Sequence, residues 1–276
     1  NQPPPRNFEK YHVSSNFLVN FWQSLFILGI ILFVILIAFT LSVFMKKSSK
    51  VAEISNKILV TLKWNVFFIL FCGNCGDIVL FTALEFKTVR FESILSLLSF
   101  LLCLLMNILM FYTLYKIIVI NSSLRTHRKK NSTISNNEEE FEKNFGSFKS
   151  LFECYKEDSY WKQVFLLIFI IRVGVFNGVI AYMSPYPLAQ PVIIVLINGG
   201  ILGYLIIKRP MKKLINFVQQ VAIEGALFIF NMCIFILAVL DAQKSENWKT
   251  RENIGNVIIF LNVATPILST TLIALK

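Results

Sequence analysis

Histidine is scarce in this chain, and the common catalytic motifs are missing from it. Only His12 and His127 occur among the 276 residues, which argues against an active site that uses histidine. The sequence also lacks a phosphate-binding loop, a GxSxG turn, an HExxH zinc motif and the protein-kinase motifs. These absences argue against an enzyme, and we expect neither catalytic residues nor a cofactor.

Cysteine does not provide a metal site either. The chain has five cysteines, and Cys72 and Cys75 form a CxxC pair within a strongly apolar stretch. A zinc site needs about four ligands, and here there is no second pair and no histidine nearby. We interpret Cys72 and Cys75 as small residues at a packing contact and predict no bound metal.

Charged residues are also few, whereas apolar residues are abundant. Charged residues make up 16% of the chain and hydrophobic residues 55%, and the mean hydropathy is +0.64. A helix needs roughly 20 apolar residues to cross the hydrocarbon core of a bilayer. Seven segments meet this requirement: 17–45, 58–86, 94–120, 161–183, 188–207, 215–240 and 254–275.

The predicted fold is therefore all-α: a polytopic membrane bundle of about seven transmembrane helices. Helices are expected because backbone polar groups in lipid must be satisfied within the spanning segment, and no alternating barrel strands are visible. Two spans are weaker than the others. The second contains polar residues such as Lys63, Asn65 and Asn74, and the seventh is interrupted by Pro266.

Lysine and arginine gather in alternate loops and predict the orientation. Basic residues follow the first, third and fifth spans, whereas the other loops are neutral or balanced. By the positive-inside rule, these three loops are cytoplasmic, the N-terminus is outside and the C-terminus is inside. The net charge of +11 then reflects topology and attraction to anionic inner-leaflet lipids rather than nucleic-acid binding. Against this orientation, the sequons at Asn121 and Asn131 fall in the third loop; we give more weight to the three concordant basic loops.

The spans and loops divide the chain into four parts. Residues 1–16 form an extracellular juxtamembrane segment, which we interpret as the end of a larger ectodomain because the chain starts without methionine. Spans one to three cover 17–120, a cytoplasmic loop covers 121–160, and spans four to seven cover 161–276. Within the loop, aromatic residues recur every three or four positions over about 141–157, which predicts an amphipathic helix at the membrane surface.

Charged residues inside spans are the strongest functional candidates, because each one costs roughly 2.5–3.5 kcal/mol at the centre of a bilayer. The candidates are Asp77, Arg172 and Glu224. Arg172 and Glu224 fall at similar depth in the fourth and sixth spans, so they can form an ion pair that locks two helices. The alternative is a pathway for ions or protons.

Small and amide residues predict how the helices pack. Gly174 with Gly178, and Gly199 with Gly203, form two small-xxx-small pairs on successive spans, which predicts close contact of spans four and five. Asparagines also recur through the spans, and we expect them to bond across helices: Asn65, Asn74, Asn107, Asn177, Asn198, Asn231 and Asn262.

Four stretches carry a resemblance to known proteins: LKWNVFFILFCGNCGDIVLFTALEF at 62–86, FGSFKSLFECYK at 145–156, YWKQVFLLIFIIR at 160–172 and KRPMKKLINFVQQVAIEGALF at 208–228. They resemble the membrane region of large surface proteins of protists, especially ciliates, described as transient-receptor-potential-like. A frequent Arg-Arg of the fourth span in that family is Ile171-Arg172 here. The resemblance implies a cysteine-rich ectodomain, often with EGF-like repeats, in the plasma or ciliary membrane.

Two functions follow as hypotheses. In the first, the bundle anchors an ectodomain in a receptor-like or assembly role, with membrane or extracellular protein partners. In the second, the bundle is a cation channel or transporter subunit in which Asp77 and Glu224 line a path. No selectivity-filter loop and no inverted repeat is evident in the sequence to favour the second.

Overall fold

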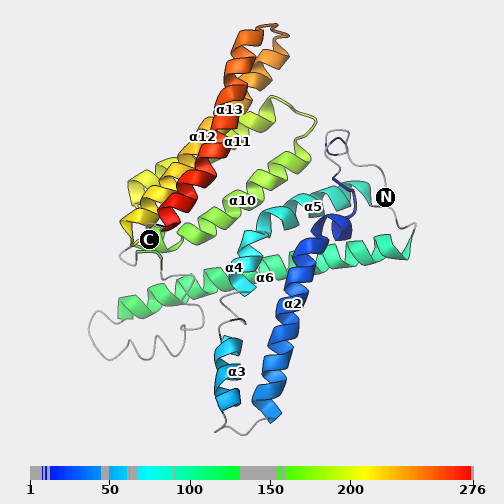
Figure 1. Ribbon diagram of the computed structural model, residues 1–276, viewed down its shortest axis with the longest axis vertical. Helices are drawn as coiled ribbons and strands as arrows, with labels where there is room; N and C mark the ends of the chain where they lie inside the picture. The colour runs from blue at the N-terminus through cyan, green and yellow to red at the C-terminus, as the bar shows by residue number, and fades with distance from the viewer. Residues whose placement is uncertain are drawn as a thin grey trace. The chain divides into compact units, whose positions relative to one another are not determined.

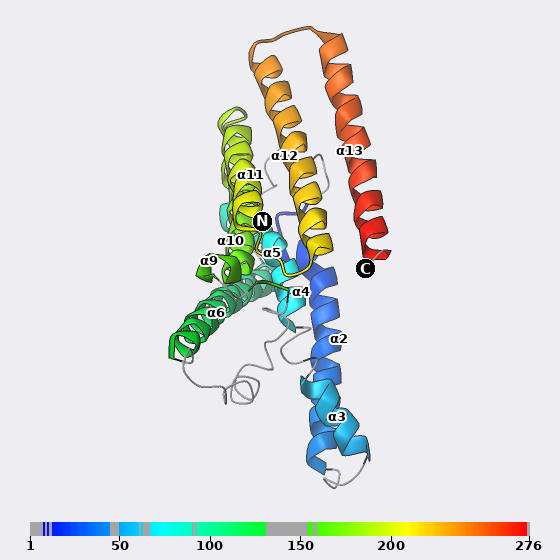
Figure 2. The ribbon, with the colours of Figure 1, turned by 90° about the vertical axis from the view of Figure 1, so that its left-hand side faces the viewer.

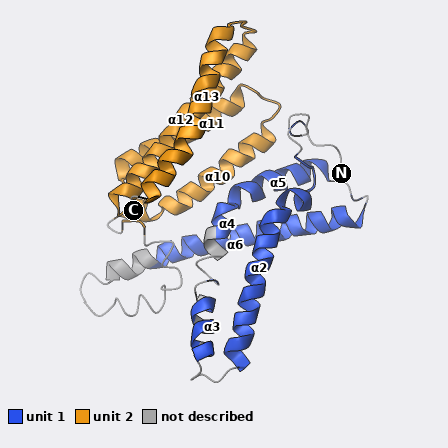
Figure 3. Ribbon diagram, viewed as in Figure 1, with its two compact units in different colours: residues 1–153 blue, residues 154–276 orange. Residues whose placement is uncertain are grey.

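The computed structural model describes residues 8, 10, 13–44, 50–60, 62, 67–89, 91, 93–130, 154–156 and 159–274. The chain divides into two compact units, residues 1–153 and residues 154–276 (Figure 3). The described residues form helices and no β-strand, apart from an isolated bridge between Tyr155 and Met211. The predicted all-α polytopic class is confirmed.

The first unit contains α2 (Phe17–Phe44), α3 (Lys50–Val60), α4 (Phe67–Gly73), α5 (Cys75–Thr88) and α6 (Ile94–Lys130) (Figure 1). Helix α2 is almost wholly apolar and packs against α3, α5 and α6. Its N-cap is Asn16, whose Oδ1 accepts the Val19 N–H at 3.4 Å. Thus the first predicted span begins at Phe17, as expected.

The second unit contains α9 (Tyr160–Gln163), α10 (Phe165–Tyr182), α11 (Ala189–Lys208), α12 (Leu214–Ala242) and α13 (Trp248–Ala274). Helix α11 packs against α10 and, more extensively, α12, which also packs against α13. Figure 2 shows α12 and α13 side by side and antiparallel. Phe165 of α10 packs with Ile201 and Leu205 of α11 in the buried apolar cluster of this unit.

Six helices in the described residues are long and apolar enough to cross a membrane: α2, α6, α10, α11, α12 and α13. At most 28% of the apolar window of each of these helices is buried within the chain, and α13 has no buried residue among those described. Exposed apolar surface on this scale suits a lipid environment, because a soluble protein rarely leaves a large continuous apolar patch uncovered. The chain is therefore an integral membrane protein.

The second predicted span differs from the expectation of one continuous helix. Residues 58–60 belong to α3, which packs against α2, whereas residues 67–73 form α4 and residues from 75 onward form α5, with a break at Asn74. Lys63 and Asn65 lie outside the described residues. The break occurs within Gly73-Asn74-Cys75, where glycine and asparagine weaken a helix. The seven-span topology requires α4 and α5 to cross the bilayer together as a broken helix, which stays a prediction.

The last predicted span is longer than expected. Helix α13 begins at Trp248, six positions before the predicted start at 254, and continues through Pro266 to Ala274. Proline removes only the one helical hydrogen bond that its missing N–H would give to the Asn262 carbonyl, and the helix continues on both sides of it. Pro266 therefore lies within the helix without ending it.

Most of the predicted cytoplasmic loop, including 141–153 of the amphipathic helix and Asn131, lies outside the described residues. Its described end is not helical. Tyr155 forms the bridge with Met211, flanked by bonds from Lys156 N–H to the Pro210 carbonyl at 2.6 Å and from Lys212 N–H to the Cys154 carbonyl at 3.0 Å. The ring of Tyr155 lies 5.6 Å from that of Phe165. Packing onto Phe165 therefore takes the place of the last predicted helical turn.

The sequon at Asn121 lies inside α6, and its residue is 3% exposed. A glycan needs an accessible asparagine in a surface loop, so this sequon does not fit glycosylation of the folded chain. The strongest sequence feature that opposed a cytoplasmic third loop is thereby weakened.

Candidate functional site: a polar network between helices

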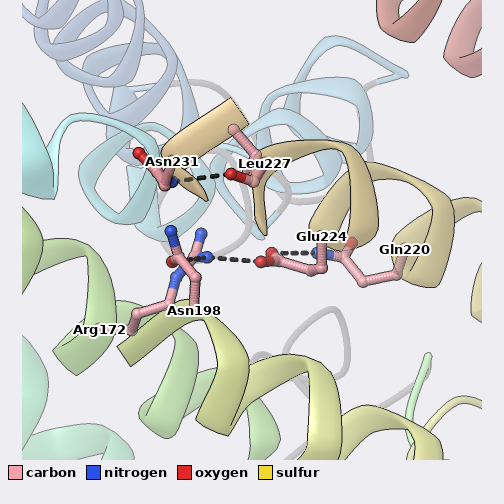
Figure 4. A network of polar contacts seen from close by, with 6 residues as sticks. All are labelled: Arg172, Asn198, Gln220, Glu224, Leu227 and Asn231. Carbon is pink, nitrogen blue, oxygen red and sulfur yellow. Dashed lines mark hydrogen bonds and ion pairs between the residues drawn. The ribbon is translucent and has the colours of Figure 1, made fainter. Parts of the chain in front are cut away.

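The site is centred on an ion pair between Arg172 of α10 and Glu224 of α12. Arg172 Nη1 lies 2.5 Å from Glu224 Oε2, and the two side chains are 11% and 1% exposed (Figure 4). The predicted pairing of these residues is therefore present. Each lies near the middle of a spanning helix, where an unpaired charge is most costly.

Two amide side chains complete the arrangement. Asn198 of α11 accepts a hydrogen bond from Arg172 Nη1 at 3.2 Å, and Gln220, one turn before Glu224, donates Nε2–H to Glu224 Oε1 at 3.1 Å. The Arg172 guanidinium also lies 4.9 Å from the ring centre of Phe169, a cation–π distance. The network, defined as Arg172, Asn198, Gln220 and Glu224, thus joins three helices.

This geometry favours locking over conduction. Both oxygens of Glu224 are engaged, one by Arg172 and the other by Gln220. A carboxylate with both oxygens bonded has little capacity left for a passing ion. Removing one partner of a buried ion pair typically destabilises a protein by about 3–5 kcal/mol, because the remaining charge is left without compensation. Arg172 Nε is buried without a hydrogen-bond partner, so the network depends on Nη1.

Asp77, the third predicted charge, is not part of this network. It lies on α5 in the first unit and its side chain is exposed. A carboxylate facing hydrocarbon costs roughly 2.5–3.5 kcal/mol. This exposed position on α5 is therefore the better candidate for a surface that meets water or another polar group.

The predicted asparagine bonds divide into two kinds. Asn74, Asn107 and Asn198 bond across helices: Asn74 Oδ1 accepts the Ser24 hydroxyl at 2.7 Å, and Asn107 Nδ2 donates to Thr82 Oγ1 at 2.9 Å. In contrast, the amides of Asn177 and Asn231 donate to carbonyls four residues earlier in their own helices. For Asn177 and Asn231, these local bonds are the ones found among the described residues, so the predicted cross-helix bond is not present there.

The predicted glycine pairs lie on α10 and α11, two helices that pack against each other as expected. A Cβ added at Gly199 would lie 3.2 Å from Cε2 of Phe228 on α12, whereas one at Gly203 would meet nothing within 4 Å. Gly199 therefore lies at the contact of α11 with α12, and its predicted role in the contact with α10 stays a prediction. Gly174 and Gly178 both lie in α10, and their role in packing α10 on α11 stays a prediction.

The structure reveals one buried charge that the sequence analysis missed, Glu85. Glu85 falls at the end of the predicted span 58–86 and was not among the candidate charges, but it lies on α5 and is 0% exposed. Its Oε2 accepts the backbone N–H of Phe17 at 2.6 Å and the hydroxyl of Ser99 at 3.1 Å. A signal was available, since Ser96, Ser99, Cys103 and Asn107 follow helical spacing on α6 and predict a face that receives polar groups.

Neither metal nor covalent chemistry is indicated by this arrangement. In the described part of the chain, no three His, Cys, Asp or Glu side chains are grouped to hold a metal ion. The five cysteines are unpaired, and Cys75 packs with its Sγ 3.8 Å from Met110 Sδ. This contact fits the packing role expected of the CxxC pair.

The fold and its polar network define a polytopic helical membrane protein. A family model described as transient receptor potential (TRP) ion channel matches residues 7–276, which is nearly the whole chain. The chain belongs to this ion channel family. No curated protein and no solved structure matches the chain.

Proposed function

We propose that the chain is the membrane domain of a cation channel subunit. The observation that carries this proposal is the match to the TRP ion channel family over residues 7–276. The Arg172–Glu224 ion pair supports this proposal, because it holds α10 and α12 in a fixed arrangement. A channel needs such a rigid group of helices, relative to which its gating helices can move. The exposed Asp77 on α5 supplies a negative charge of the kind that attracts cations at a pore entrance or wall.

The experiment is ion flux through the purified protein in liposomes under an ion gradient. Wild-type protein is expected to pass cations, and Asp77→Asn to reduce the flux while its elution and melting match those of the wild type. Glu246→Gln is the matched control, because Glu246 is an exposed acid in the loop between α12 and α13. No flux from well-folded wild-type protein would overturn the proposal.

A second function is a receptor-like or assembly role in which the bundle anchors an ectodomain. The specific observation in its favour is the fixation of the chain at the start of α2, where the Phe17 N–H donates to Glu85 Oε2 of α5 at 2.6 Å. A firmly held entry segment suits a chain that bears load or conveys a signal. Flux experiments separate the two, because an anchor is silent and insensitive to Asp77→Asn.

The proposed setting is the plasma or ciliary membrane, with the N-terminus outside and the C-terminus inside. Anionic inner-leaflet lipids are the proposed partners of the basic turn after α11, which contains Lys208, Arg209, Lys212 and Lys213. Each basic residue near such a surface contributes about 1 kcal/mol. Binding to vesicles with and without anionic lipid tests this. Wild-type protein is expected to bind the anionic vesicles more tightly, and a variant with all four basic residues replaced by alanine is expected to bind both kinds of vesicle equally.

A further inference from the structure

The start of α2 has side-chain partners for all four of the N–H groups that a helix N-terminus leaves unpaired. Asn16 N–H bonds Ser14 Oγ at 3.1 Å and Val19 N–H bonds Asn16 Oδ1 at 3.4 Å. The other two partners come from different helices: Phe17 N–H bonds Glu85 Oε2 at 2.6 Å, and Leu18 N–H bonds Ser99 Oγ at 3.1 Å. The first turn of α2 is therefore held from outside by α5 and α6.

Glu85 is the centre of this contact. Its side chain and that of Phe17 are both 0% exposed, and a helix N-terminus favours a negative charge. Glu85 Oε2 also accepts the Ser99 hydroxyl, so one oxygen links three helices. The other oxygen, Oε1, is buried without a hydrogen-bond partner. A buried acceptor left unpaired is destabilising, so this carboxylate is held only through its bonds to Phe17 and Ser99.

Helix α5 is attached to α2 at both of its ends. Near its C-terminal end, Glu85 Oε2 accepts the Phe17 N–H at 2.6 Å, and Thr88 Oγ1, whose shorter bond is to the Leu84 carbonyl at 2.8 Å, lies 3.3 Å from the Ser15 carbonyl. At its N-terminal end, Asn74 Oδ1 accepts the Ser24 hydroxyl at 2.7 Å. The break at Asn74 separates α5 from α4. Helix α5, which is 14 residues long, is thus expected to move together with α2 and is partly uncoupled from α4.

We propose that Glu85 is the joint through which residues 13–17 act on α5 and α6. A displacement of this entry segment pulls directly on a carboxylate of α5, because the bond is made by the backbone N–H of Phe17 and not by a flexible side chain. When the Phe17 and Ser99 bonds to Glu85 break, α5 and α6 are released from the entry segment. The break at Asn74, where the backbone bond from Asn74 N–H to the Leu70 carbonyl remains at 3.0 Å, lets α5 respond with less movement of α4.

Hydrogen exchange on the full chain in lipid nanodiscs tests the joint. In Glu85→Gln, a neutral amide replaces the charged acceptor, and the amides of Phe17 and Leu18 are expected to exchange roughly tenfold faster. The decisive readout is α5 itself, where exchange at residues 85–88 is expected to rise in parallel. Faster exchange confined to α2 would overturn the proposal, because Glu85 would then be only a cap. Ser99→Ala supplies a second variant with an intact carboxylate, and Glu53→Gln on exposed α3 is the control.

The effect of the joint on channel opening rests on the proposed function. In conducting protein, Glu85→Gln is expected to change the open fraction. A disulfide between Ser15→Cys and Thr88→Cys, in a Cys154→Ser background that removes an exposed thiol, is expected to restore the wild-type value. An open fraction that Glu85→Gln leaves unchanged would remove the gating role. Absence of ion conduction by the wild type would instead count against the proposed channel function. The hydrogen-exchange data would still test whether Glu85 couples the entry segment to α5.

Discussion

Arg172 and Glu224 are 52 positions apart in the sequence, yet their side chains meet with Nη1 2.5 Å from Oε2. The contact joins α10 to α12, while Asn198 of α11 bonds the same nitrogen. An unpaired charge in a spanning segment is strongly destabilising, and each of these two charges offsets that cost for the other. The pair therefore fixes how three helices of the second unit are placed against one another.

Removing one charge from this pair should lower the stability of the protein more than removing both charges. Arg172→Leu and Glu224→Leu are each expected to lower stability by about 3–5 kcal/mol, because each leaves a buried charge unpaired. The double variant is expected to recover part of the loss. Folded yield and thermal melting in detergent measure this, and failure of the double variant to recover would contradict the locking role.

The exposed pair of Glu53 and Lys57 is the control for this experiment. Its atoms are 2.8 Å apart, but the side chains are 66% and 75% exposed. Exposed ion pairs contribute about 0.2–1 kcal/mol, so the corresponding leucine variants are expected to change melting little. A large effect at both pairs would indicate a general response to lost charge.

Gly199 and Gly203 offer a matched pair of alanine substitutions on one helix. Alanine in a helix is more favourable than glycine by about 0.5–1 kcal/mol, and nothing lies within 4 Å of the added Cβ at Gly203. Gly203→Ala is therefore expected to stabilise. Gly199→Ala places a Cβ 3.2 Å from Phe228 Cε2 and is expected to melt below Gly203→Ala. Adding Phe228→Leu to both alanine variants should narrow the difference between their melting temperatures, because the ring that the Gly199 Cβ meets is removed. Equal melting temperatures of the two single alanine variants would show that the contact between Gly199 and Phe228 is loose.

Asn107 and Asn177 test which intramembrane amides hold helices together. Both donate to a carbonyl of their own helix, but only Asn107 also reaches another helix, through Thr82. Such cross-helix bonds contribute roughly 0.6–2 kcal/mol. Asn107→Leu is expected to destabilise by that amount and Asn177→Leu to have little effect. Melting of both variants checks this, and the reverse order would contradict it.

Apolar length predicted most of the fold because a spanning helix has to be both long and apolar. The spans at 17–45 and 188–207 match α2 and α11 within one residue at each end. Depth in the span was also sufficient to pair Arg172 with Glu224. These features depend on one-dimensional quantities, namely hydropathy and the count of residues from the end of a span.

The remaining features depend on contacts that hydropathy does not contain. Glu85 lies at the very end of a predicted span, and its role becomes visible only when the N-terminus of α2, 68 positions away in the sequence, is placed beside it. Likewise, Gly199 could face α10 or α12, and spacing alone does not choose between them. The break at Asn74 is intermediate, since Gly73 and Asn74 give a local signal that the surrounding apolar residues outweigh.

Asp77 provides the sharpest test of cation conduction. Its exposed carboxylate on α5 would attract cations and repel anions if α5 borders the path. Under a tenfold salt gradient, a cation-selective wild type is expected to show a reversal potential approaching about 59 mV, and Asp77→Asn should move it towards zero. Asp77→Lys should move it further and favour anions. Because Asp77 forms no hydrogen bond or ion pair with the residues that the structure describes, melting should stay close to that of the wild type. A reversal potential that neither substitution shifts, in channels that still conduct, would place the path away from α5.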